Sequence, residues 1–156
     1  HGLRGMRTLE NLASRRAIGD RLTHLINTGD ESLIDKLSNG GADKIKSKML
    51  AEAWQKEDAL AVEVITDSAR HVGIAAANAV TLLSLPRVVL GGGVVEALGE
   101  SYTAIVRDAF RQNVFPPELQ DTEILTGELG DDAGILGAAA LARQAQDESA
   151  RRAAHV

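Results

Sequence analysis

The sequence VTLLSLPRVVLGGGVVEA, residues 80–97, decides the fold that we expect for this chain. Pro86 ends the preceding helix, because its ring disfavours helical geometry in the residue before it. Arg87–Leu90 is a short, largely β-branched and apolar run, which predicts a strand buried on both faces. Gly91–Gly93 follow at once and let another molecule approach the main chain, and a helix is expected over Val94–Gly99. This junction of strand end and helix start is where open α/β sheets hold ligands, and helix-start amides favour anionic groups.

A glycine-rich turn after a strand can also be a tight connection and nothing more. Neither of the common phosphate fingerprints, G-x-G-x-x-G and G-x-x-x-x-G-K-[ST], occurs in the sequence. The turn on its own therefore leaves two interpretations open, a nucleotide-binding loop and a plain connection.

The composition indicates a globular protein with an aliphatic core. Hydrophobic residues make up 44% of the 156 residues, while aromatic residues make up only 3%. The net charge of −5 argues against nucleic acid as a bulk partner, which needs a basic surface. The absence of cysteine favours a reducing, cytoplasmic setting, and the apolar runs are too short to cross a membrane. From the sequence we expect a soluble cytoplasmic protein without membrane partners.

Apolar residues at helical spacing predict that helices dominate the chain. The longest helix is expected over 59–83, with an apolar stripe that includes Ala61, Ile65 and Ala69. Gly73 lies on a neighbouring face of small residues, so we expect this helix to pack closely against another element. Further helices are expected over 9–26, 31–37, 44–55, 100–112 and 133–146, a second strand over 122–125, and helix caps at Thr8, Asp43, Asp58 and Asp131 or Asp132.

The number of predicted strands is too small for an independent sheet with both faces covered. No internal repeat or linker divides residues 1–156, so we expect a single domain. The shortage of strands favours one lobe of a larger protein.

Three segments together resemble the C-terminal part of the ROK family (repressors, open reading frames, kinases). They are LENLASRRAI at 9–18, LLSLPRVVLGGGV at 82–94 and GDDAGILGAA at 130–139, and their order and spacing both fit. The family belongs to the hexokinase and actin-like ATPase superfamily. The resemblance implies an α/β fold: a helix-rich C-terminal lobe of the ribonuclease H-like type, with a small sheet flanked by helices.

The resemblance also implies which residues bind ligands. In ROK sugar kinases a glutamate of a Gly-Cys-x-Glu motif hydrogen-bonds sugar hydroxyls, and Glu10 stands at that position. The run Gly91, Gly92 and Gly93 resembles the adenosine motif of the superfamily, which lies along the nucleotide. ATP with Mg²⁺ is the implied cofactor. From the residues alone, Glu10 is also explained as an acid that the dipole stabilises in the first turn of a helix.

Two departures from the family pattern limit what this chain can do. The zinc-binding cysteine positions of the family read His1, Leu3 and Thr8 here, and leucine and threonine supply no zinc ligand, so we expect no zinc. The N-terminal lobe, with its phosphate loop and catalytic aspartate, is absent from this sequence. We therefore expect no catalytic residue in the chain, and no activity from it alone.

Three functions remain open at this stage. The first is the nucleotide- and sugar-binding lobe of an ATP-dependent hexose or amino-sugar kinase of glucokinase type. The intact glycine run favours it, because that run fits nucleotide use. The second is the sugar-sensing effector lobe of a ROK transcriptional repressor. The third is an interaction domain that keeps the scaffold without a ligand. The expected partners are a hexose or amino-sugar substrate, the missing N-terminal lobe and a second copy of the chain.

Overall fold

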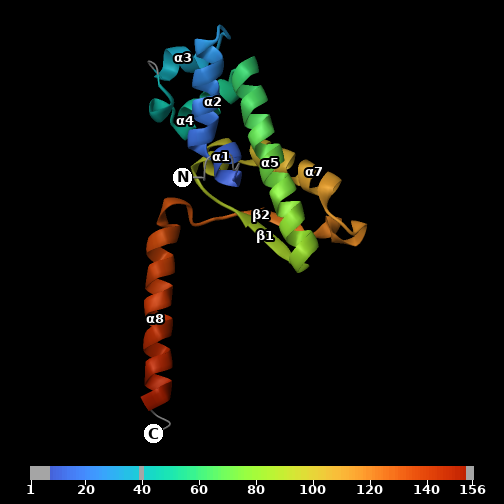
Figure 1. Cartoon of the computed structure of the whole chain (residues 1–156). Coiled ribbons are helices and arrows are strands. Elements are labelled where there is room, and N and C mark those ends of the chain that lie inside the picture. The colour runs from blue at the N-terminus through green and yellow to red at the C-terminus, as the bar shows by residue number, and fades with distance from the viewer. Residues whose placement is uncertain (1–7, 39–40, 154–156) are drawn as a thin grey trace. The chain divides into compact units, whose positions relative to one another are not determined.

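The computed structural model describes residues 8–38 and 41–153, with side chains at all of these except Asp131 and 148–153. The chain divides into two compact units between Thr126 and Gly127. The helix-rich α/β class with a small sheet is confirmed (Figure 1). The first unit contains α1 (Leu9–Ala13), α2 (Arg15–Asn27), α3 (Leu33–Ser38), the 3-10 turn η1 (Ala42–Lys44), α4 (Ser47–Gln55), α5 (Ala59–Leu83), β1 (Arg87–Leu90), α6 (Gly93–Leu98), α7 (Glu100–Asn113), η2 (Pro117–Asp121) and β2 (Glu123–Thr126). The second unit contains η3 (Gly130–Asp132) and α8 (Ala133–Ala153).

The helix expected over 9–26 is two helices, because the chain turns extended at Ser14, with φ −70° and ψ 157°. The Ser14 hydroxyl accepts a hydrogen bond from the backbone N–H of Ala17 at 3.1 Å, which caps the start of α2. Thr8 caps α1 as predicted, in a reciprocal pair of hydrogen bonds with Asn11. The break at Ser14 lets α1 leave the direction of α2, and so it sets where the first turn of α1 points.

Two other predicted caps have different outcomes. Asp58 precedes α5 and accepts hydrogen bonds from the backbone N–H groups of Ala61 at 2.9 Å and Leu33 at 2.7 Å, as well as from a serine hydroxyl. The prediction of Asp43 as a cap is wrong, because Asp43 lies inside η1 and α4 begins only after Lys46. The cap predicted at Asp131 or Asp132 stays a prediction, although α8 does begin at Ala133.

The sheet consists of β1 and β2 in parallel, with Val88 opposite Ile124. The prediction that β1 is buried on both faces is wrong. Leu90 is buried, whereas the Val89 side chain, on the opposite face, is 62% exposed. Successive strand residues point to opposite faces, and the helices of the first unit cover only one of them.

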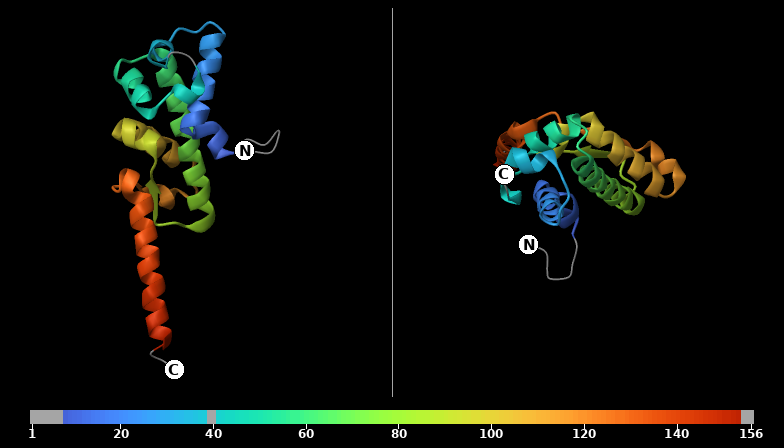
Figure 2. Two further views of the ribbon diagram at one scale, coloured as in Figure 1. Left: turned by 90° about the vertical axis from the view of Figure 1, so that its left-hand side faces the viewer. Right: turned by 90° about the horizontal axis from the view of Figure 1, so that it is seen from above.

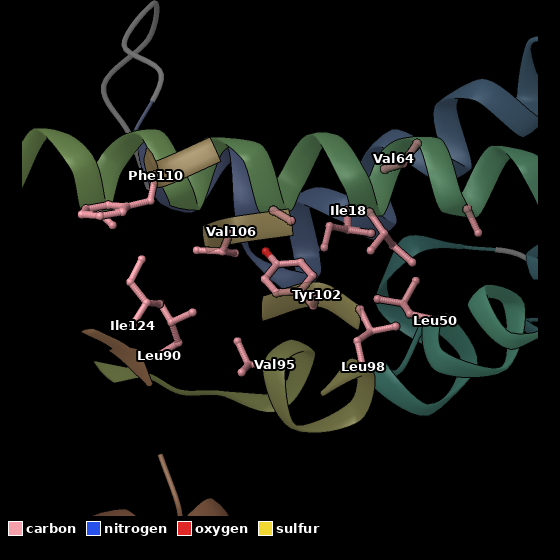
Figure 3. Packing of buried hydrophobic residues seen from close by; sticks show 14 of the residues in the cluster. Ile18, Leu50, Val64, Leu90, Val95, Leu98, Tyr102, Val106, Phe110 and Ile124 are labelled. Carbon is pink, nitrogen blue, oxygen red and sulfur yellow. The ribbon is translucent and has the colours of Figure 1, made fainter. Parts of the chain in front are cut away.

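The core of the first unit is built on α5, which lies beside α7 (Figures 1 and 2). Gly73 allows the close approach: a Cβ placed there would lie 2.5 Å from the Val106 carbonyl oxygen and 2.6 Å from the Ala109 Cβ. Tyr102, Val106 and Phe110 follow one another along the inner face of α7 (Figure 3). The small face predicted for this long helix therefore packs as expected.

Candidate functional site

The residues predicted to bind ligands line one pocket of the first unit, which has a volume of about 490 Å³. Five parts of the chain form it: α1 with the start of α2, the start of α4, the middle of α5, the start of α7, and the end of β1 with the turn into α6. Glu10 and Gly91–Gly93 both line this pocket, although 80 residues separate them in the sequence. The lining residues are Leu9, Glu10, Ala13, Ser14, Arg15, Ser47, Val72, Leu90, Gly91, Gly92, Gly93, Val94, Val95 and Tyr102.

The glycine run presents exposed main chain to the pocket. The structural reason for a glycine differs among its three positions. Gly92 has φ 98°, in the region that L side chains rarely adopt, and it directly precedes α6. A Cβ at Gly93 would lie 3.1 Å from the Ser47 Oγ, so glycine permits the close approach of α4. Gly91 has open space around its Cβ position and no left-handed φ. Neither backbone strain nor crowding explains a glycine at position 91. The structural effect of this glycine is that it leaves space open in the pocket.

Glu10 lies in the first turn of α1 with its side chain exposed. It also lines a second pocket of about 550 Å³, together with Asn11, Arg16, Asp20 and other residues of α1 and α2. The carboxylate thus borders both hollows. A position in the first helical turn is favourable for an acid whatever its function. The helix position of Glu10 is therefore no evidence of ligand binding, and its location at the edge of the pocket is the observation that bears on it.

A series of hydrogen bonds links the end of α1 to α5 and α7 beside the pocket. The Tyr102 side chain is only 2% exposed, and its hydroxyl lies 3.0 Å from the Ser68 Oγ. Ser68 in turn donates a hydrogen bond to the carbonyl oxygen of Ala13 at 3.3 Å, at the end of α1. Burial raises the pKa of Tyr102, and the bond to Ser68 only partly offsets this, so the phenol stays neutral at physiological pH.

Within residues 8–38 and 41–153, the charged side chains that line this pocket are one acid, Glu10, and one base, Arg15. The walls otherwise consist of aliphatic side chains, main chain, and the hydroxyl groups of two serines and a tyrosine. Such a surface suits a ligand with a flat or apolar part and a few polar groups. Sequence reasoning missed Arg15 and Ser47, whose only signal was a place beside a helix start.

No cluster of three or more metal-binding side chains occurs among the described residues. Of the three positions that correspond to zinc ligands, His1 and Leu3 lie outside the described residues, and Thr8 serves as the α1 cap. The helices within the described ranges all lack the combination of length and hydropathy that a bilayer span requires.

A sequence model of the ROK family matches residues 2–145 of the chain. A glucokinase from Halalkalibacterium halodurans is 28% identical over 139 residues, which are 89% of this chain and 42% of the glucokinase. A xylose repressor from Caldicellulosiruptor bescii is 27% identical over 133 residues, which are 85% of this chain and 33% of the repressor. The similar proteins therefore include a kinase and a regulator, and the chain spans less than half the length of either.

Solved structures give the same picture of the fold. The crystal structure of a ROK family glucokinase from Streptomyces griseus, in complex with glucose and AMPPNP, matches with a TM-score of 0.75 and 32% identity. The match covers 87% of this chain and 44% of that protein. ROK sugar kinases have the actin-like ATPase fold, so the expected fold type is confirmed.

Proposed function

Because this chain belongs to the ROK family, we propose that it is the C-terminal, nucleotide- and sugar-binding lobe of an ATP-dependent hexose kinase of glucokinase type. The observation that carries the proposal is the meeting of Glu10 and Gly91–Gly93 around one pocket. A pocket bordered by both the expected sugar-binding acid and the expected nucleotide-binding turn supports the proposal, because both ligands of a kinase must meet at one site.

The pocket has the surface that a nucleoside requires. The exposed main chain of Gly91–Gly93 offers a wall without side chains, and the half-buried Val72 and Val94 add apolar surface beside it. A ring and ribose would lie against this wall, and backbone amides near the start of α6 would then be placed to face the phosphates. AMPPNP, bound in the Streptomyces griseus glucokinase, is an ATP analogue and supports this assignment. Mg²⁺ would neutralise phosphate charge, with ligands that include the phosphates themselves.

Glu10 would accept hydrogen bonds from sugar hydroxyls at the edge of the same pocket. A carboxylate suits this role because it offers two oxygens that accept hydrogen bonds from neighbouring hydroxyls. Phosphoryl transfer also needs a general base, which this proposal places in the N-terminal lobe. Accordingly, we expect the chain to bind ligands but not to turn them over without that lobe, and we expect a hexose or amino sugar as substrate.

The second candidate is the effector lobe of a ROK transcriptional repressor. The similarity to the xylose repressor over 85% of this chain favours it, and regulators of the family need no catalysis. The two candidates differ in their ligands: a kinase lobe binds a nucleotide and a sugar, whereas a sugar-sensing lobe needs only the sugar.

The test is steady-state kinetics of the intact protein with ATP and a panel of hexoses and amino sugars. Replacing Glu10 by alanine should raise the sugar KM roughly tenfold to a hundredfold, because about 1.5–3 kcal/mol is lost with a charged hydrogen bond. The KM for ATP should stay nearly constant. Asp35→Ala is the matched control, since Asp35 is likewise an acid in the first turn of a helix but lies outside the pocket lining.

Equal sugar kinetics in Glu10→Ala and the unaltered protein would reduce Glu10 to a helix-start acid. Sugar binding without any nucleotide binding or phosphoryl transfer would instead favour the repressor lobe.

A further inference from the structure

Among the described residues, Arg15 is the cationic one that lines the main pocket, and it has no role in the function proposed above. Arg15 is the first residue of α2 and lies on the same pocket as Gly91–Gly93. Its side chain is exposed, and no ion pair or hydrogen bond of this side chain occurs among the described residues. Arg15 therefore lines the hollow, and no partner of its guanidinium occurs in the part of the chain that the structure describes.

The neighbouring arginines of α2 differ from Arg15 in this respect. Arg16 lies 3.9 Å from the Asp20 carboxylate, and Arg21 donates to Asp67 at 2.8 Å and lies 3.5 Å from Glu63. Those pairs give Arg16 and Arg21 protein partners on the surface, and the Arg21 pairs join α2 to α5. No comparable pair explains Arg15.

The position of Arg15 is also electrostatically unfavourable for the helix. The first turn of a helix carries the positive end of its dipole, where acidic side chains stabilise and basic ones destabilise. Backbone N–H groups at this end and the guanidinium both favour an anion nearby. An anionic group in the pocket would relieve the repulsion and satisfy the guanidinium at the same time.

We propose that Arg15 binds a phosphate group of the pocket's ligand, namely a phosphate of the nucleotide whose ring and ribose lie along Gly91–Gly93. This inference rests on the proposed function and adds a residue to it. A guanidinium is suited to the task because its planar donors match two phosphate oxygens at once. We assign a nucleotide phosphate because Arg15 lines the pocket of the glycine run. Glu10 lines the same pocket, so the experiment includes a hexose 6-phosphate to distinguish a sugar phosphate from a nucleotide phosphate.

The experiment is isothermal titration of the intact protein with ADP, adenosine and a hexose 6-phosphate, for the unaltered protein, Arg15→Gln, Arg15→Lys and the control Arg16→Gln. Arg15→Gln should weaken ADP binding about tenfold to a hundredfold, the usual effect of losing a charged hydrogen bond. Adenosine binding should be unchanged, which also shows that the pocket is folded. Arg15→Lys should retain part of the ADP affinity, and Arg16→Gln should retain all of it.

Unchanged ADP affinity in Arg15→Gln would overturn the inference while leaving the proposed function intact. So would an equal loss of ADP and adenosine binding, which would indicate a packing role. Loss of hexose 6-phosphate binding alone would overturn the assignment to a nucleotide phosphate. If the unaltered protein binds neither ADP nor adenosine, the proposed function fails first and this inference fails with it.

Discussion

A valine at position 91 is the cleanest perturbation of the proposed nucleotide wall. Gly91 lines the pocket, its Cβ position has no neighbour within 4 Å, and its φ lies outside the left-handed region. Valine at this position should therefore enter the hollow without straining the backbone. Gly92→Val is a poorer probe, because φ 98° would add about 1–3 kcal/mol of strain to any effect on binding.

The expected magnitude follows from the space that the side chain takes. Three added carbon atoms would displace the ring or ribose from its contacts, at a cost of about 1–3 kcal/mol, comparable to overpacking a core. That corresponds to a roughly fivefold to 150-fold increase in Kd for AMPPNP. The free energy of unfolding should change by less than about 1 kcal/mol, because the new side chain meets nothing in the unliganded protein.

Titration calorimetry with AMPPNP and urea unfolding of the same samples measure both effects. Gly29→Val is the control for backbone strain, since Gly29 has φ 114° and lies between α2 and α3, outside the pocket lining. This control should lose stability and keep its nucleotide affinity. Unaltered AMPPNP affinity in a folded Gly91→Val protein would mean that the glycines only turn the chain.

Two further predictions concern the scaffold that holds the pocket. Gly73→Ala should lower the free energy of unfolding. Overpacking against Val106 costs about 1–3 kcal/mol, which exceeds the roughly 1 kcal/mol gained in helix propensity. Urea unfolding measures the change, and equal or higher stability would show that α5 and α7 separate easily. The pKa of Asp58 is the second case: burial alone would raise it, but hydrogen bonds from two backbone N–H groups and a serine hydroxyl outweigh burial and hold it below its ordinary 3.8. The stabilisation is then fully present above pH 3.8 and is lost as the pH falls through the lower folded-state pKa. Asp58→Asn should flatten this part of the profile of unfolding free energy against pH, and an unchanged slope would contradict the argument.

Local chemistry made much of the fold predictable. Asp58 and Pro86 act on their immediate neighbours, and both ends of α5 were placed correctly from them. The break at Ser14 was missed because helical spacing continues across it, and a serine within such a pattern does not reveal whether its hydroxyl caps a new helix. The exposure of Val89 was missed because a β-branched run does not reveal which neighbours cover its two faces.

The candidate site was predictable only in part, for a related reason. Glu10 and Gly91–Gly93 came from the resemblance to a family, since no spacing rule connects residues so far apart in the chain. Their meeting depends on the packing of α1 against α5 through Ser68 and on the close approach of Ser47 to Gly93. Those contacts join distant segments, and sequence periodicity carries no information about them.

The most direct test of the central claim is a crystal structure of the intact protein with AMPPNP and its sugar. The account predicts the nucleoside against the main chain of Gly91–Gly93 and a Glu10 carboxylate oxygen within hydrogen-bond distance of a sugar hydroxyl. A nucleotide bound elsewhere, with this pocket empty and Glu10 turned to solvent, would contradict it.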